Sequence, residues 1–398
     1  MIDRFMVRYC DFLMQTWVKV IVLVLFLALL AGCTYSSTQL EQAFSFTDVL
    51  PSDSYIADSY YRSEDYSEIS GVEPDVCFRY VDQSDPDIQD QMEDYVNQLV
   101  DTVQFTEQPP FFWLRDFKAF VSNSTHNLTD LHFNDQLDAF LADPIYFDLY
   151  DNNIVRDGDG NIVASRLHMR MDNVNQEDVV ASIAALEDQR YVGASQPINE
   201  GRSDWAFFTW ANQYYIWDFY AVAQYEMTLT AVLGIISVTI IGTIFIPHWT
   251  AVSFVLPLIS MLYVDLLGVL QISGVAINAV SYVSIVMSVG LMVDFLLHIL
   301  LRYYESKERT REAKVKDTLR TMGSSILIGG ISTFLGVIPL AFSSSEIFNT
   351  IFITFMGLVT LGVSHGLILI PVVLSLVGTT DCINIEDDDE SGEMGESI

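Results

Sequence analysis

A single charged residue interrupts the apolar stretch at residues 276–301, which is long enough to cross a bilayer as a helix. That residue is Asp294. An Asp near the centre of a membrane helix costs about 2.5–3.5 kcal/mol on insertion scales, so we expect its side chain to face a bundle interior, a partner or water rather than lipid. Gly290 and His298, four residues before and after it, share its helix face.

This spacing suits a proton or cation relay. Gly290 leaves space beside the Asp294 carboxyl group, and a histidine such as His298 exchanges a proton near neutral pH. The same residues also fit a second interpretation, in which hydrogen bonds keep Asp294 neutral inside a packed bundle and His298 reaches the lipid headgroups. Both interpretations remain open at this point.

Further polar residues lie in other apolar stretches. Asp265 is near the outer end of its stretch, where an interfacial or helix-packing carboxylate is the favoured interpretation over a relay member. Ser332 and Thr333 belong to a stretch in which small residues recur, a pattern that lets helices approach closely, and Thr333 could also hydrogen-bond Asp294. His365 lies mid-span and needs a polar partner, as a structural histidine or as a relay member.

Six stretches are long and apolar enough to be transmembrane helices. They cover residues 17–33, 227–246, 249–270, 276–301, 322–342 and 348–377. With 398 residues, of which 51% are hydrophobic, the chain also has room for one sizeable domain in water. The sequence therefore predicts an α-helical membrane protein with a five-helix bundle at 227–377 and a separate domain after the first helix.

Charge sets the orientation. Residues 302–320 contain seven of the 19 Lys and Arg residues and are cytoplasmic by the positive-inside rule, which also places residues 1–16 inside. The acidic tail, 378–398, is expected to be cytoplasmic and disordered. Residues 34–226 then face the lumen or the cell exterior of a multi-pass protein in the plasma membrane or an endomembrane. A net charge of −33 argues against nucleic acid as a partner.

Two observations support an outward-facing domain at 34–226. Residues 34–225 hold 34 acidic against nine basic residues, and Asn123 and Asn127 begin two glycosylation sequons. Alternating and helical patterns occur in the order strand, helix, strand, strand, helix, strand, which is typical of an α+β ferredoxin-like fold with residues 107–150 inserted. The expected elements are 75–81, 86–105, 152–156, 161–171, 177–191 and 206–210.

No pattern in the chain favours an enzyme, a cofactor or a metal. The turn at Asp157, Gly158, Asp159 and Gly160 partly matches a calcium loop, but Arg166 occupies the place of the essential bidentate carboxylate, so a hairpin turn is favoured. The four cysteines are too scattered for a disulfide framework or a zinc site.

A competing interpretation concerns residues 30–33. Leu-Ala-Gly-Cys at this position is similar to the cleavage box of bacterial lipoproteins, and a basic segment precedes the apolar one. Cleavage before Cys33 would yield a lipoprotein or a secreted enzyme. The basic segment is long for a signal sequence and the later stretches already anchor the chain, so a first transmembrane helix is favoured.

Five segments resemble the second half of the Patched and Niemann-Pick type C proteins, in the resistance-nodulation-division (RND) permease superfamily. Residues 286–298, VMSVGLMVDFLLH, are similar to the tenth transmembrane helix of that family. Residues 322–325, 345–348 and 361–375 resemble the eleventh and twelfth helices, and 47–54 resembles the segment after the seventh.

The resemblance implies one half of a 12-helix permease that moves sterol or another lipid, coupled to a gradient through a Gly-x-x-x-Asp acid, here Gly290 and Asp294. His298 and His365 would be its proton partners. The other half is missing, so the chain is expected to pair with a second copy or a separate half, or to be a truncated gene model. A sterol-sensing receptor or scaffold that does not pump is the alternative.

Overall fold

The computed structural model describes residues 2–43, 50–66, 72–105, 107–123, 128–175, 178–246 and 248–380. Asn127 and residues 381–398 of the predicted acidic tail lie outside these ranges, as does the side chain of Asn123. The chain divides into two compact units, one formed by 1–59 with 223–398 and the other by 60–222. Each unit is described by itself.

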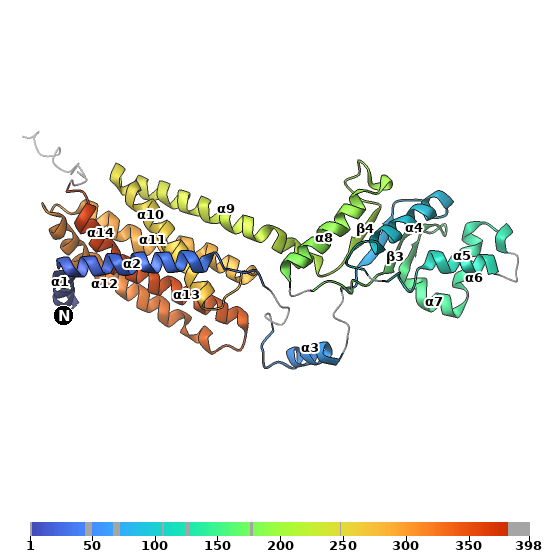
Figure 1. The fold of residues 1–398 in the computed structure, drawn as a ribbon, viewed down its shortest axis with the longest axis horizontal. Coiled ribbons are helices and arrows are strands. Elements are labelled where there is room, and N and C mark those ends of the chain that lie inside the picture. Colours follow the sequence, from blue (N-terminus) through green and yellow to red (C-terminus); the bar gives the residue numbers. More distant parts are fainter. Residues whose placement is uncertain are drawn as a thin grey trace, which may run out of the picture. The chain divides into compact units, whose positions relative to one another are not determined.

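The first unit is a bundle of long helices, and six helices in the described residues are long and apolar enough to cross a membrane. This agrees with the six spans predicted from the sequence (Figure 1). The spans and their extensions are α2 (Thr16–Ser37), α9 (Tyr214–Phe245), α10 (Trp249–Ile272), α11 (Ala279–Glu305), α12 (Arg311–Val337) with a 3₁₀ turn (Ile338–Phe342), and α13 (Glu346–Ser364) continued by a π-helical turn (His365–Leu369) and α14 (Ile370–Val377).

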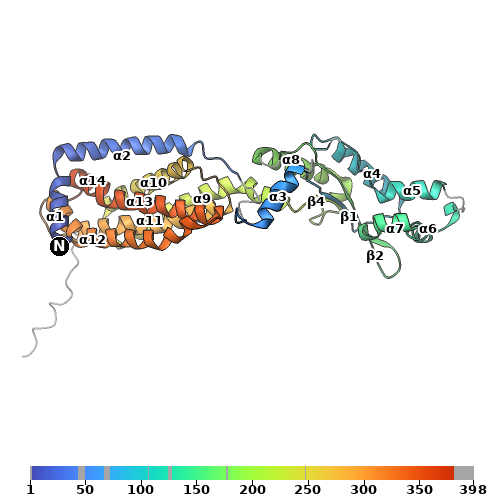
Figure 2. The ribbon, with the colours of Figure 1, turned by 90° about the horizontal axis from the view of Figure 1, so that it is seen from below.

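An additional helix, α1 (Ile2–Leu13), precedes the first span and was not among the predicted elements. Met6, Cys10 and Leu13 recur at helical spacing and are buried, so one face of α1 is apolar. That face packs against α12, beside which α1 lies in Figure 2. The Tyr9 hydroxyl also donates a hydrogen bond to the carbonyl of Leu367 in the π turn.

Two features determine how the spans pack. Helix α2 lies along α10, where a Cβ added at Gly268 would be 2.4 Å from the Cα of Cys33. Helix α11 contacts α10, α12 and α13 and begins with a capping box between Asn278 and Ser281. The residues 30–33 of the lipoprotein interpretation therefore lie inside a continuous helix, with Cys33 buried against α10.

The second unit contains one antiparallel sheet in the order β2-β3-β1-β4. This is the strand order of the ferredoxin-like fold predicted from the sequence. The strands are β1 (Asp75–Arg79), β2 (Ile154–Arg156), β3 (Ile162–His168) and β4 (Phe207–Trp210), and the two crossover helices are α4 (Pro86–Val100) and α8 (Val179–Ala194). The insertion folds as α5 (Trp113–Asn123), a 3₁₀ turn (Leu128–Asp130), α6 (Phe133–Leu141) and α7 (Pro144–Tyr150), and α3 (Tyr55–Tyr66) precedes the sheet.

Local chemistry explains the β2–β3 hairpin. The Asp157 carboxylate accepts hydrogen bonds from the backbone N–H groups of Asp159 and Asn161, and Gly160 adopts a φ of 89° that favours glycine. These hydrogen bonds lower the pKa of the Asp157 carboxyl group. The DGDG segment is thus a hairpin turn, as favoured over a calcium loop.

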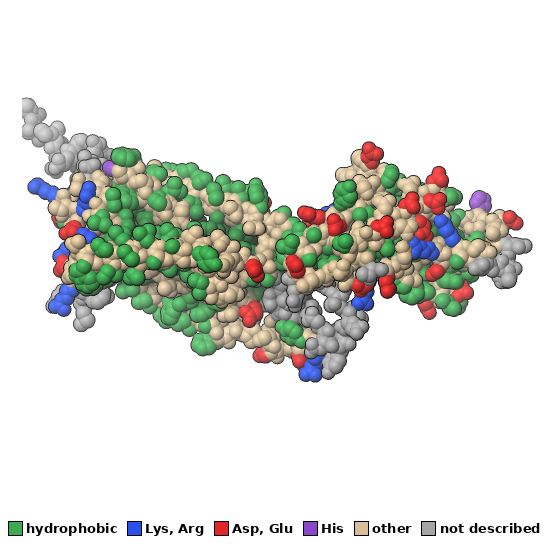
Figure 3. Space-filling view, in the orientation of Figure 1, with side chains coloured by type: hydrophobic (Ala, Val, Ile, Leu, Met, Phe, Trp, Pro, Cys, Tyr) green, Lys and Arg blue, Asp and Glu red, His purple; other side chains and the backbone are tan. Residues whose placement is uncertain are grey.

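The surfaces of the two units differ in composition. In the space-filling view, hydrophobic side chains cover the visible face of the helical bundle, whereas Asp and Glu side chains are frequent on the second unit (Figure 3). Exposed apolar residues on α2 and α9 include Leu25, Leu27, Ile240 and Ile244. Such a surface is stable in the hydrocarbon of a bilayer, and the acidic surface of the second unit is stable in water.

Candidate functional site

The Asp294 side chain lies on the exposed face of α11. Its side chain is 71% exposed and that of His298 is 61% exposed, and the two are 3.9 Å apart between Oδ1 and Nε2. We expected Asp294 to face a bundle interior, a partner or water. Its exposure excludes the interior of the chain's own bundle, as well as the alternative of a carboxyl group hidden in helix packing, and leaves a partner or water.

The pattern of α11 explains this placement. Its buried residues, such as Ser288, Met292 and Phe295, pack against the neighbouring spans. The opposite face carries Val283, Met287, Gly290, Asp294 and His298, all exposed and at helical spacing. We call these five residues the α11 stripe. No atom of the described residues lies within 4 Å of a Cβ added at Gly290, so the space expected beside the carboxyl group is present.

His365 does not pair with Asp294. Its Nε2 lies 3.1 Å from Oδ2 of Asp265, and its Nδ1 lies 2.8 Å from the carbonyl oxygen of Leu361. Both side chains are fully buried, so of the two roles favoured for Asp265, an interfacial or a helix-packing carboxylate, the structure matches the second, in which Asp265 joins α10 to the π turn. Phe26 of α2 packs its ring edge-on against the imidazole.

Ser332 and Thr333, the polar residues predicted on α12, do not contact Asp294 or His365 in the hydrogen bonds of the described residues. Thr333 donates its hydroxyl hydrogen bond to the carbonyl of Gly329 in its own helix. The hydrogen bond from Thr333 to Asp294, which the sequence left possible beside a packing role, is not the one that the structure shows. Ser332 is exposed, and a Cβ added at Gly329 would meet no atom within 4 Å. Gly329 and Ser332 thus lie on a face of α12 that no described residue covers closely.

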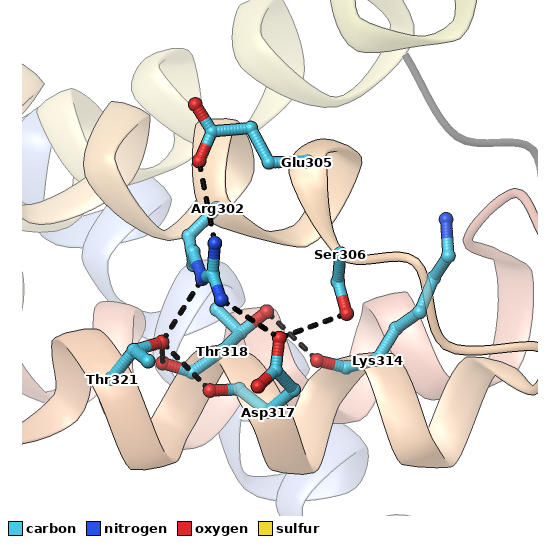
Figure 4. Close-up of polar contacts among 7 residues, drawn as sticks. All are labelled: Arg302, Glu305, Ser306, Lys314, Asp317, Thr318 and Thr321. Atoms are coloured by element: carbon cyan, nitrogen blue, oxygen red, sulfur yellow. Dashed lines mark hydrogen bonds and ion pairs between the residues drawn. The ribbon is translucent and has the colours of Figure 1, made fainter. Parts of the chain in front are cut away.

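A polar cluster connects the basic ends of α11 and α12 (Figure 4). The Arg302 guanidinium contacts Asp317 at 3.1 Å, Glu305 at 3.7 Å and the Thr321 hydroxyl at 3.2 Å, and Ser306 donates to Asp317 at 2.9 Å. The recess beside it is lined by three basic and three acidic side chains, so its charges balance and favour no anionic ligand. The cluster closes the turn between two spans.

An apolar cavity of about 460 Å³ lies where α1, α12, α13 and the π turn meet. Its lining includes Met6, Ile331, Phe334, Val359 and Leu367. Among the described residues that line it, Tyr9, Thr360 and Ser364 carry hydroxyl groups, and those of Tyr9 and Ser364 already donate to backbone carbonyls. The size and lining suit an apolar ligand.

Comparison with curated proteins finds relatives among sterol transporters and Patched proteins. The chain is 38% identical over 122 residues to the pig NPC intracellular cholesterol transporter 1, covering 30% of this chain and 10% of the relative. It is 36% identical over 135 residues to zebrafish Protein patched homolog 1, covering 33% and 11%. It is 25% identical over 378 residues to a Niemann-Pick type C1-related protein of Toxoplasma gondii, covering 93% and 31%. No family model matches the chain.

The fold also matches a solved structure of the hedgehog release protein Disp from the water bear Hypsibius dujardini. The TM-score is 0.68 at 13% identity, and the match covers 95% of this chain but 50% of that one. At this identity the likeness shows the fold alone. The chain thus spans half of this structure and less than a third of the length of the curated relatives it matches.

Proposed function

We propose that this chain, which belongs to the Patched- and Niemann-Pick type C-like branch of the RND permease superfamily, is one half of a membrane transporter for sterol or another lipid. In this proposal Asp294 binds the proton or cation whose gradient drives transport. His298 exchanges a proton with it, and Gly290 keeps the space beside the carboxyl group open.

The observation that carries the proposal is the exposed Asp294 on the α11 stripe, which apart from Asp294 and His298 is apolar. In lipid this carboxyl group would cost about 2.5–3.5 kcal/mol. A homologous six-helix half placed against the α11 stripe would replace lipid by protein and polar groups around Asp294 and His298. The match to half of a longer RND-like fold supports such a partner, which would be a second copy or a separate half.

Two observations support lipid as the substrate class. Relatives over the matched segments are named as cholesterol transporters. The cavity between α1 and the α12–α13 pair is almost wholly apolar and lies within the membrane unit, where a sterol or an acyl chain could enter from the bilayer.

Gradient-driven lipid flux tests this function. The purified chain is reconstituted into liposomes, and transfer of a fluorescent sterol is followed with and without an imposed proton or sodium gradient. We expect flux to rise with one of the gradients in the wild type and to fall at least tenfold in Asp294→Asn, because the amide cannot release a proton or neutralise a cation. Asp159→Asn, in the exposed hairpin turn, is the matched control.

Two outcomes would contradict the proposal. Equal flux in the wild type and Asp294→Asn would remove Asp294 from the mechanism. Sterol binding without any flux that depends on a gradient would favour the sensing receptor over the transporter. The wild type and Asp294→Asn must be recovered in the liposomes in equal amounts, so that a difference in flux reports transport rather than insertion.

A further inference from the structure

The hydrogen bonds of His365 require that either Asp265 or His365 carries a proton in addition to the one on Nδ1. The carbonyl oxygen of Leu361 only accepts hydrogen bonds, so the Nδ1 atom 2.8 Å away must carry the imidazole hydrogen. A neutral imidazole then has only a lone pair at Nε2. Oδ2 of the Asp265 carboxylate, 3.1 Å from Nε2, also has only lone pairs. The two atoms can therefore form a hydrogen bond only if one of them is protonated.

Burial shows where that proton is held best. Both side chains are fully buried, and Oδ1 of Asp265 has no hydrogen-bond partner of ordinary geometry among the described residues. A charged carboxylate whose second oxygen has at most the weak thiol donor of Cys33 beside it is costly in such a place, whereas a neutral carboxylic acid leaves only a carbonyl there. The Oδ2–H group can then donate to Nε2, and the pair carries no net charge.

No neighbouring cation would stabilise a charged Asp265 among the residues that the structure describes. Cys33 of α2, a weak donor, is the titratable side chain beside the carboxyl group. Lys19 of the same helix is paired with Glu312 at 2.7 Å, and Asp294 and His298 of α11 lie on its exposed face. Besides His365 itself, the described residues of α13 and the π turn contain one charged side chain, that of Glu346, the first residue of α13.

We propose that Asp265 and His365 form a second proton-binding site, in which Asp265 is a neutral carboxylic acid that donates a hydrogen bond to His365. Release breaks the Oδ2–H bond, passes the proton to water and leaves a carboxylate. Because Phe26 and Cys33 cover the pair, water reaches it only when α2 separates from α10. Use of this proton during transport rests on the proposed function; the protonated pair itself does not.

Infrared spectroscopy of the full chain in lipid nanodiscs at neutral pH tests the site. A protonated carboxyl group has a C=O stretching band separate from those of carboxylates. We expect Asp265→Asn to remove the intensity of one such group, and Asp159→Asn in the exposed hairpin turn, the matched control, to leave it unchanged. The side-chain amide introduced by Asp265→Asn can still donate to Nε2, so this variant should keep its melting temperature.

A wild-type spectrum without a protonated-carboxyl band that Asp265→Asn removes would overturn the proposal. Should Asp265→Asn fail to fold, Asp265→Glu serves instead, because it should move the band rather than delete it. The band reports the pair whether or not the chain transports lipid, so loss of flux in Asp294→Asn with an intact band would separate the two proposals. Normal gradient-driven flux in a folded Asp265→Asn would exclude the pair from transport.

Discussion

Two acids in the membrane spans illustrate how strongly surroundings determine the role of a residue. Asp294 is exposed beside His298 on α11, whereas Asp265 is enclosed between α10, α2 and the π turn with its own histidine. The first carboxyl group is open to whatever covers the α11 stripe, and in the proposed function it exchanges ions there. The second is cut off from water, so its proton is held until the helices part.

Cys77 of β1 is a residue whose reactivity follows from its environment. Burial, and then the nearby charge of Asp75, raise the pKa of its thiol from 9.0 to about 11. The thiolate is the reactive form, so its fraction at pH 8 should be about 100-fold lower than at the ordinary value. We expect alkylation of Cys77 by N-ethylmaleimide, followed by peptide mass spectrometry, to be correspondingly slow and to accelerate up to about pH 11.

The same peptide from the chain unfolded in urea provides the control, since its thiol should react about 100-fold faster at pH 8. Equal rates in the folded and unfolded chains would show that burial does not suppress the thiolate. A rate that stops rising below pH 10 would contradict the direction of the shift.

At the scale of elements, the close approach of α2 to α10 keeps Phe26 and Cys33 of α2 over the buried Asp265–His365 pair. The contact depends on Gly268, because any side chain there would overlap the backbone of Cys33. Small residues that allow backbones to touch are a general means of joining helices in membranes, where lipid supplies no hydrophobic force between them.

Gly268→Ala should therefore lower stability by about 1–3 kcal/mol, because the helices must shift to admit the methyl group. Thermal unfolding of the detergent-solubilised chain, followed by tryptophan fluorescence, measures the effect. Gly329→Ala on α12 is the matched control, since its added Cβ meets no atom within 4 Å and should leave the melting temperature equal or slightly higher. Equal melting temperatures for the two variants would disprove the tight contact.

For the whole molecule, the question is what covers the α11 stripe. An expression host that makes no homologous half offers only a second copy of this chain. Met287 of the stripe and Ile240 of α9 are equally exposed, at 55% and 56%, which makes them a matched pair for disulfide cross-linking.

In a chain without its native cysteines, we expect Met287→Cys to form a cross-linked dimer on mild oxidation in membranes, because α11 would face its copy across a two-fold axis. Ile240→Cys should cross-link far less. Electrophoresis without reductant measures both. Absence of a dimer in Met287→Cys would exclude a second copy as the partner at this face.

Much of the architecture could be read from local sequence patterns. An apolar stretch of about 20 residues must satisfy its own backbone hydrogen bonds in lipid, so the six spans are predictable one at a time. The ferredoxin-like order follows from alternating and helical periodicities, and the DGDG turn from the residue types a hairpin needs. Helix α1 was missed although Met6, Cys10 and Leu13 have helical spacing, a signal that would have identified it.

The sequence by itself determined which segments are helices and strands, and that Asp294, Gly290 and His298 share a face, because these properties depend on residues near in the chain. Only the tertiary structure decided which faces are covered. It turned Asp294 outward and brought Asp265 to His365, 100 residues away. The reason is physical: burial is set by neighbouring helices, and two acids in similar apolar stretches look alike until those neighbours are placed.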